Sequence, residues 1–193
     1  MADISAALIG FLGVMAGGYF NNFFAEDYRR FRDGQALAGA LAGELESHTA
    51  PIPRIREGLA IMEEQIRSGK KLDLPEWPMP PSPIFDQNAA KIGSLGAETA
   101  KEVAYVYEHL RAYRQNFHML SKHNGAMPVE WSHATIIGCL AIISRSENRA
   151  VQLAITLTGQ TEESYWRRPQ TQAQLKYGAA VIAAFLLALK VFG

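Results

Sequence analysis

The distribution of apolar residues divides the chain into two uncharged ends and a middle with helical periodicity. Residues 4–25 carry no charged side chain, and residues 177–189 form a second uncharged stretch. Between them apolar residues recur every three or four positions, which is typical of amphipathic helices, and no run has the period of a strand. The pattern therefore predicts an all-α protein whose ends differ in kind from its body.

The first uncharged segment has the length of a membrane helix. Its residues, at about 1.5 Å each, give roughly 33 Å of helix, against a hydrocarbon core about 30 Å thick. A cleavable signal would carry basic residues before the apolar run, whereas the only early charge here is Asp3. We predict a transmembrane helix over residues 1–25, the alternatives being a buried helix of a soluble core and a removed signal.

Small residues recur within this segment at intervals of three or four positions. In lipid, such a face lets two helix backbones approach closely, although glycine is also common in membrane helices for other reasons. The predicted helix-packing face consists of Ala6, Gly10, Gly13 and Gly17.

The last segment, residues 169–193, is predicted to be a second transmembrane helix or a helix lying in the membrane interface. Basic residues follow the first span and precede the second, which by the positive-inside rule places the body on the cytoplasmic side of an inner membrane. Aromatic and basic side chains beside the spans are the expected interface anchors: Tyr19, Phe23, Arg29, Arg30, Arg32, Trp166, Arg167 and Arg168.

The body, residues 26–168, is predicted to be a small cytoplasmic helical bundle. Its helices are expected at 31–47, 54–68, 84–92, 97–121 and 128–158. Pro51 and Pro53 end the first of these, and Gly69, Gly93 and Gly159 close later ones. The last two helices, joined by a short Gly/Pro turn, are expected to form a long antiparallel hairpin.

A proline-rich loop, residues 74–83, interrupts the helical pattern and is predicted to be extended. Such segments can dock into aromatic grooves of partner proteins. Alternatively, the loop lies across its own bundle, with Trp77 filling a hydrophobic gap. The residues proposed for partner contact are Trp77, Pro78, Pro80 and Pro81.

Charge and cysteine content exclude several classes of function. Nineteen acidic and nineteen basic side chains give a net charge of zero, so no overall field favours nucleic acid. The single Cys139 excludes an internal disulfide and a multi-cysteine zinc site.

The stretch Phe85–Gly96, FDQNAAKIGSLG, resembles a pattern in uncharacterised bacterial proteins that have an N-terminal membrane segment followed by a charged, alanine-rich helix. The resemblance covers about a third of the chain. It implies a bacterial, membrane-anchored protein and supplies no activity and no site residues.

Motifs for catalysis or cofactor binding are scarce. Glu130 and His133 form a Glu-x-x-His pair, the spacing found in di-iron bundles, and Glu44 with His48 lies one turn apart. No second Glu-x-x-His exists, so surface or capping roles are expected for these residues. We expect no catalytic residues, cofactor, metal or small-molecule substrate.

These observations predict a membrane-anchored helical scaffold or interaction protein without catalytic activity. The expected partners are the lipid bilayer and either a second copy of the chain or another membrane protein. The alternatives are a membrane-perturbing or pore-forming small protein and a metal-dependent bundle enzyme.

Overall fold

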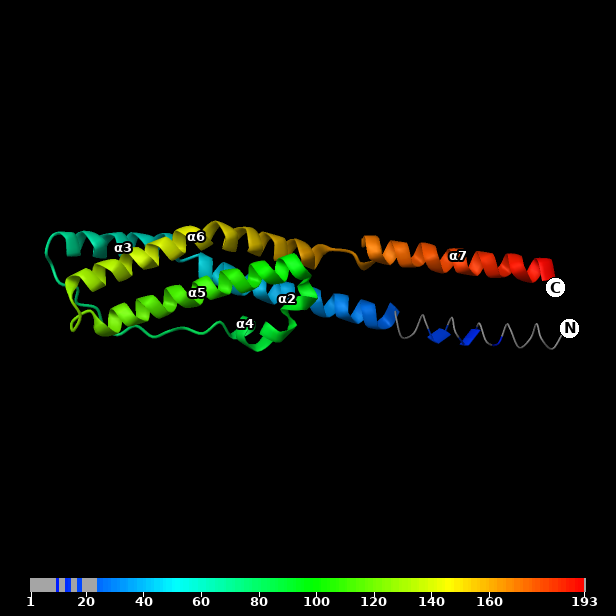
Figure 1. Cartoon of the computed structure of the whole chain (residues 1–193), viewed down its shortest axis with the longest axis horizontal. Helices are drawn as coiled ribbons and strands as arrows, with labels where there is room; N and C mark the ends of the chain where they lie inside the picture. Colours follow the sequence, from blue (N-terminus) through cyan, green and yellow to red (C-terminus); the bar gives the residue numbers. More distant parts are fainter. Residues whose placement is uncertain (1–9, 11–12, 15–16, 19–23, 193) are drawn as a thin grey trace. The chain divides into compact units, whose positions relative to one another are not determined.

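The structure is a computed structural model that describes residues 10, 13–14, 17–18 and 24–192, with the backbone alone at 184–186 and 188–192. This part of the chain is mostly helical and contains no strand, which confirms the all-α prediction (Figure 1). The chain forms two compact units. One is a body of residues 35–161, and the other is a terminal unit drawn from residues 1–34 and 162–193.

Helices supply nearly all of the described chain. In order they are α2 (Ala25–Thr49), α3 (Ile52–Arg67), α4 (Pro83–Asn88), the 3-10 helix η2 (Ala89–Leu95), α5 (Ala97–His123), α6 (Val129–Glu162), the 3-10 helix η3 (Tyr165–Arg167) and α7 (Pro169–Phe192).

Helices α5 and α6 form the predicted antiparallel hairpin (Figure 1). Only residues 124–128 separate them. The same two helices supply side chains to both hydrophobic clusters of the body. The hairpin is therefore the element on which the rest of the body packs.

The break between α2 and α3 lies at the predicted prolines. Only Ala50 and Pro51 separate the helices, and the Ile55 amide donates to the Pro51 carbonyl at 3.0 Å to begin α3. Pro53 falls in the first turn of α3, where its missing N–H costs nothing. Gly69 ends α3 in the left-handed region at φ 79°, as predicted from the sequence.

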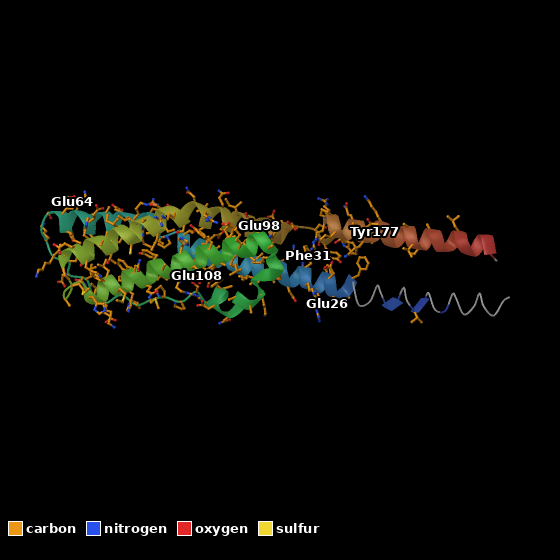
Figure 2. The ribbon with its side chains drawn as sticks, viewed as in Figure 1. Glu26, Phe31, Glu64, Glu98, Glu108 and Tyr177 are labelled. Atoms are coloured by element: carbon orange, nitrogen blue, oxygen red, sulfur yellow. The ribbon has the colours of Figure 1, made fainter. Side chains whose placement is uncertain are left out.

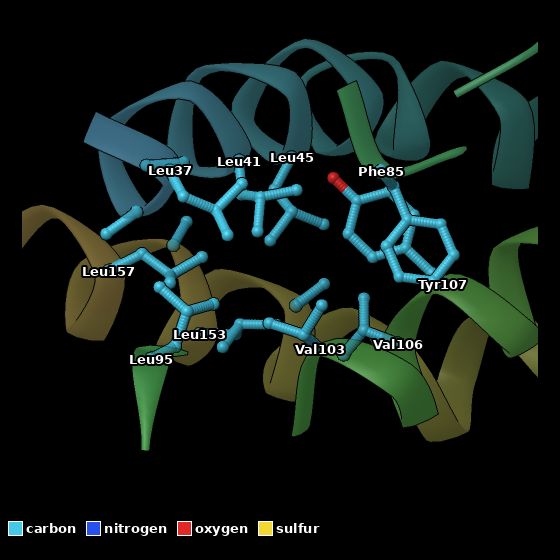
Figure 3. Packing of buried hydrophobic residues seen from close by; sticks show 14 residues of the cluster. Leu37, Leu41, Leu45, Phe85, Leu95, Val103, Val106, Tyr107, Leu153 and Leu157 are labelled. Carbon is cyan, nitrogen blue, oxygen red and sulfur yellow. The ribbon is translucent and has the colours of Figure 1, made fainter. Parts of the chain in front are cut away.

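The break lets the α2 and α3 faces build separate cores. On the α2 side, apolar residues of α2 meet the first half of α5 and the second half of α6 (Figure 3). On the α3 side, Leu59 and Ile66 meet Leu120, Ile136 and Cys139. Cys139 is fully buried in this second core, and its burial raises the pKa of the thiol to about 11.

Two predicted helix ends are wrong. The chain leaves η2 at Gly96, with φ 89°, and not at Gly93, because Leu95 is carried into the core before the chain turns. Helix α6 passes through Gly159 and continues to Glu162. The Gln160 side chain anchors this last turn by donating to the Leu95 carbonyl and the Thr99 hydroxyl, which outweighs the low helix propensity of one glycine.

In the terminal unit an aromatic cluster joins the start of α2 to η3. Tyr165 packs edge-on against Tyr28, with ring centroids 5.2 Å apart, and also contacts Phe31. Its hydroxyl donates to Asp27 at 2.9 Å, and Arg168 lies 3.7 Å from the same carboxylate. The residues flanking the two predicted spans are thus held to each other.

Within the described residues, no helix is both long and apolar enough to cross a membrane. The predicted first span, residues 1–25, lies mostly outside those residues. The predicted second span is helical, as α7, but its assignment as a transmembrane helix gains no support from the structure. Tyr177 of α7 is 75% exposed (Figure 2).

Candidate binding site

The proline-rich loop lies along α5 in the opposite direction. We call residues 74–82 the strap. As residue numbers rise along the strap, the numbers of the residues that contact it on α5 and at the α5 C-cap fall. Leu74 meets the C-cap residue Asn124, Trp77 meets Ser121, and Ser82 meets Arg114. The strap has no regular secondary structure of its own, and side chains at the end of α5 bind its backbone at Leu74 and Trp77.

The anchors of Leu74 and Trp77 are side chains at the end of α5 and Asn124, the residue that caps it. The Leu74 amide donates to Asn124 Oδ1 at 3.4 Å, and Asn124 Nδ2 donates to the Leu74 carbonyl at 3.3 Å. The Ser121 hydroxyl accepts the Trp77 amide at 2.9 Å, and His118 Nδ1 donates to the Trp77 carbonyl at 2.7 Å.

A cavity of about 380 Å³ lies between the strap, α3 and α5. Its walls are mainly apolar, with Ile55, Leu59 and Met62 from α3 facing Leu110 and Phe117 from α5. The strap contributes Trp77, Pro78 and Pro80, and its Trp77 ring packs edge-on against Phe117 with centroids 6.2 Å apart. Trp77 stays 55% exposed, so it covers the cavity without filling it.

A buried carboxylate fixes the far end of the strap. Glu44, only 8% exposed, accepts the Ile84 and Phe85 amides at 2.8 and 3.1 Å, which caps the first turn of α4. The Tyr107 hydroxyl donates to the same carboxylate at 2.7 Å, and the Tyr107 ring stacks on Phe85 at 4.1 Å. Burial, together with this bond to Glu44, raises the pKa of Tyr107.

Arg114 stands where the cavity meets the strap. Its Nη1 donates to the Ser82 hydroxyl at 2.7 Å, and its Nη2 lies 3.0 Å from His48 Nδ1. Since a guanidinium only donates, His48 must offer an unprotonated nitrogen. Burial, aided by the positive charge of Arg114, lowers the pKa of His48, in agreement with a neutral ring.

The cluster of Glu44, His48 and Ser82 has the residue types of a hydrolytic triad but not its geometry. Ser82 Oγ lies 3.5 Å from His48 Nε2 and accepts a shorter bond from Arg114. Both oxygens of Glu44 are used by α4 and Tyr107, so Glu44 does not orient the imidazole. The arrangement suits binding better than nucleophilic attack.

In the part of the chain that the structure describes, the Glu-x-x-His pair does not belong to any group of three potential metal ligands. His133 Nε2 lies 3.9 Å from Glu63 of α3, while Glu130 is exposed. Nowhere among the described residues do three potential ligands of these types come together.

The predicted partner-contact residues lie together on the strap. Residues 75–81 are all exposed. A second hollow of about 260 Å³ lies beside Pro80, Pro81 and Arg114. The sequence analysis expected a surface or capping role for Glu44 but not its burial beneath α4, and it did not identify a role for Arg114. The signal for Glu44 was present, since it stands beside Leu45 on the apolar face that also carries Leu41.

The predicted membrane residues fall partly outside the described chain. Ala6, Tyr19 and Phe23 are among the residues left undescribed. Gly10, Gly13 and Gly17 are exposed, and a Cβ at any of them would meet nothing within 4 Å.

The basic and aromatic anchors lie in the terminal unit. Arg29 and Arg30 pair with Glu26, and Arg168 pairs with Asp27, while Trp166 and Arg167 are exposed. Arg32 also has an interaction partner.

Comparison of the chain with protein-family models, with curated proteins and with solved structures finds no match. The resemblance of Phe85–Gly96 to bacterial membrane-anchored proteins therefore assigns no family. Function has to be argued from the geometry.

Proposed function

We propose that this chain is a membrane-anchored adaptor. Its two terminal segments hold it at the inner membrane, and its body, on the cytoplasmic side, presents the strap to a partner protein. The partner is either a second copy of the chain or another membrane protein. No catalytic activity is proposed.

The exposed strap is the observation that carries the partner-binding part of the proposal. Its backbone is held at Leu74 by Asn124 and at Trp77 by Ser121, and Arg114 holds the Ser82 hydroxyl, yet the apolar side chains of Trp77 and Met79 are more than half exposed. Proline-rich segments that are already extended lose little entropy on docking into aromatic grooves. The α5 anchors thus hold the strap ready for binding.

The sequence and the terminal unit support the membrane part. Residues 4–25 are uncharged, and in α7 the apolar residues Val181 and Leu187 are largely exposed. Trp166 and Tyr28 are exposed beside a group of arginines, the combination that suits the headgroup region. Tyr165 joins η3 to the start of α2 through its contacts with Tyr28 and Asp27. These contacts would keep two adjacent membrane spans together.

Photo-crosslinking in native membranes tests partner binding. A photoreactive side chain at Met79 is expected to give one discrete crosslinked band, which mass spectrometry identifies as a second copy or another protein. Combining Trp77→Ala with Pro80→Ala should remove most of the band. Ile61→Ala, a truncation at an α3 residue of equal 55% exposure, should leave it unchanged. If Met79 captures nothing, or if the strap variant crosslinks as well as the control, the adaptor role is wrong.

Membrane fractionation tests the anchor separately. The intact chain, with Met1 retained, is expected in the high-speed pellet and to resist extraction by alkaline carbonate. A deletion of residues 1–25 should leave α7 as the remaining anchor and weaken that resistance. Recovery of the intact chain in the detergent-free supernatant would contradict membrane anchoring and would leave the strap proposal standing.

A further inference from the structure

The cavity beneath the strap is an apolar hollow with a cation at one edge. Its volume of about 380 Å³ falls in the range of small-molecule sites, and its walls are mostly aliphatic and aromatic. The packing of the body leaves this space open, because the strap residues above it expose their side chains. Arg114 and His48 are among the polar residues on its wall.

Arg114 is a half-buried guanidinium whose hydrogen-bond partners are neutral. It donates to the Ser82 hydroxyl and to the His48 ring, and no ion pair among the described residues includes it. Glu44 and Asp86 act on it electrostatically from beyond ion-pair distance. The carboxylate of Glu44 is occupied by the α4 amides and Tyr107, so it is not free to approach.

We propose that this cavity binds a fatty acid, with the acyl chain lying between α3 and α5 beneath the strap and the carboxylate on Arg114. A guanidinium presents paired N–H donors that match the two oxygens of a carboxylate. Ile55, Met62 and Phe117 provide the surface for the chain, and Trp77 and Pro80 cover it. The proposal does not rest on the protein partner proposed above, although both sites use Trp77 and Pro80.

The chemistry predicts how affinity depends on the ligand. Each additional buried CH2 should tighten binding about fourfold until the cavity is full. Replacing the carboxylate by its methyl ester removes the charge that Arg114 recognises and should weaken binding at least about tenfold. If all four additional CH2 groups are buried, dodecanoate should therefore bind about two orders of magnitude more tightly than octanoate. It should also bind at least about tenfold more tightly than methyl dodecanoate.

Tryptophan fluorescence of the full-length chain in lipid nanodiscs tests the proposal directly. With Trp131→Phe and Trp166→Phe, Trp77 is the only tryptophan left. A brominated fatty acid should quench Trp77 in a saturable manner, with one molecule bound per chain. A chain that keeps only Trp166 reports partition into the lipid and should show quenching that does not saturate.

Two variants locate the site independently. Arg114→Gln keeps a donor for Ser82 but loses the charge, and should weaken binding at least about tenfold. Gly58 lines the cavity, and a Cβ there would meet nothing within 4 Å, so Gly58→Phe should fill the space and abolish saturable quenching. Gly43→Phe is the matched control, because Gly43 of α2 is equally open but does not line the cavity.

Three results would overturn the proposal. They are quenching of Trp77 that never saturates, equal binding of the methyl ester, and unchanged binding in Gly58→Phe. Because Gly58 takes no part in the Arg114 cluster, its variant decides the matter even if Arg114→Gln disturbs the fold.

Discussion

The groove beside α5 is covered in different ways in the α2 and α3 halves of the body. On the α2 side, α4 and η2 cover the groove beside α5, and they insert Phe85 and Leu95 into the core. On the α3 side only the strap covers the corresponding groove, and about 380 Å³ stays open. A helical cover carries side chains inward at regular intervals, whereas a proline-rich cover lacks donors and must be held from outside.

The strongest test of this comparison removes the carboxylate that holds α4 in place. Glu44→Ala leaves two backbone amides and the Tyr107 hydroxyl without their acceptor, and should lower the free energy of unfolding by about 3–5 kcal/mol. Glu44→Gln keeps an acceptor oxygen and should cost roughly half as much. Urea unfolding measures both, with the exposed Glu46→Ala expected within about 0.5 kcal/mol of the parent. If Glu44→Ala and Glu46→Ala were equally stable, Glu44 would not stabilise the first turn of α4.

A pair of leucine truncations compares the two cores directly. Leu157→Ala, in the closed half, should cost about 3–5 kcal/mol, since all of its neighbours lose contacts. Leu59→Ala, equally buried but on the cavity wall, should cost about 2–3 kcal/mol because it borders space that is already open. The two values come from the same unfolding experiment. A larger loss at Leu59 would mean that the cavity is closed in solution.

The dependence of the strap on α5 is expected to appear as a local effect. Ser121→Ala removes the acceptor of the Trp77 amide and should speed exchange of that amide about fivefold to tenfold, while global stability falls by about 1 kcal/mol. Hydrogen exchange read by mass spectrometry on a peptide spanning the strap measures this. Ser146→Ala removes a hydroxyl from α6 away from the strap and should leave the exchange unchanged.

The smallest expected effect is on pH dependence. The folded state lowers the pKa of His48, so the unfolded chain binds the proton more readily and stability rises with pH. Stability should be complete well above the ordinary histidine pKa of 6.5 and decline as the pH falls through it. Thermal unfolding between about pH 7.5 and pH 5.5 should show a steeper decline in the parent than in His48→Gln. Identical slopes would show that His48 is not held neutral.

Much of the body could be predicted because periodicity and proline positions are local signals. The faces of α5 and α6, the break at Pro51 and the turn at Gly69 all follow from residues a few positions apart. The α6 end at Glu162 does not, because Gln160 is anchored by residues of η2 and α5 that lie more than sixty positions away.

The candidate site was only half visible from the sequence. The strap was recognised as extended and as a possible contact surface, since its prolines exclude a helix. The cavity below it depends on where Trp77 comes to lie, and the Arg114 cluster depends on a fold that joins α2, α5 and the strap. Such long-range proximity leaves no mark on the spacing of residues along the chain.

Asn124 links the strap to the chemical lifetime of the protein. It precedes Gly125, and in an Asn-Gly pair the glycine lets the following backbone nitrogen attack the side-chain amide, so that asparagine converts slowly to aspartate. Here the amide is engaged by Leu74 and by the Ser121 carbonyl. If the hydrogen bonds between Asn124 and Leu74 break, Asn124 becomes more prone to deamidation. The resulting aspartate could no longer donate to the carbonyls of Leu74 and Ser121. Detachment of the strap at this end would therefore become permanent as the protein ages.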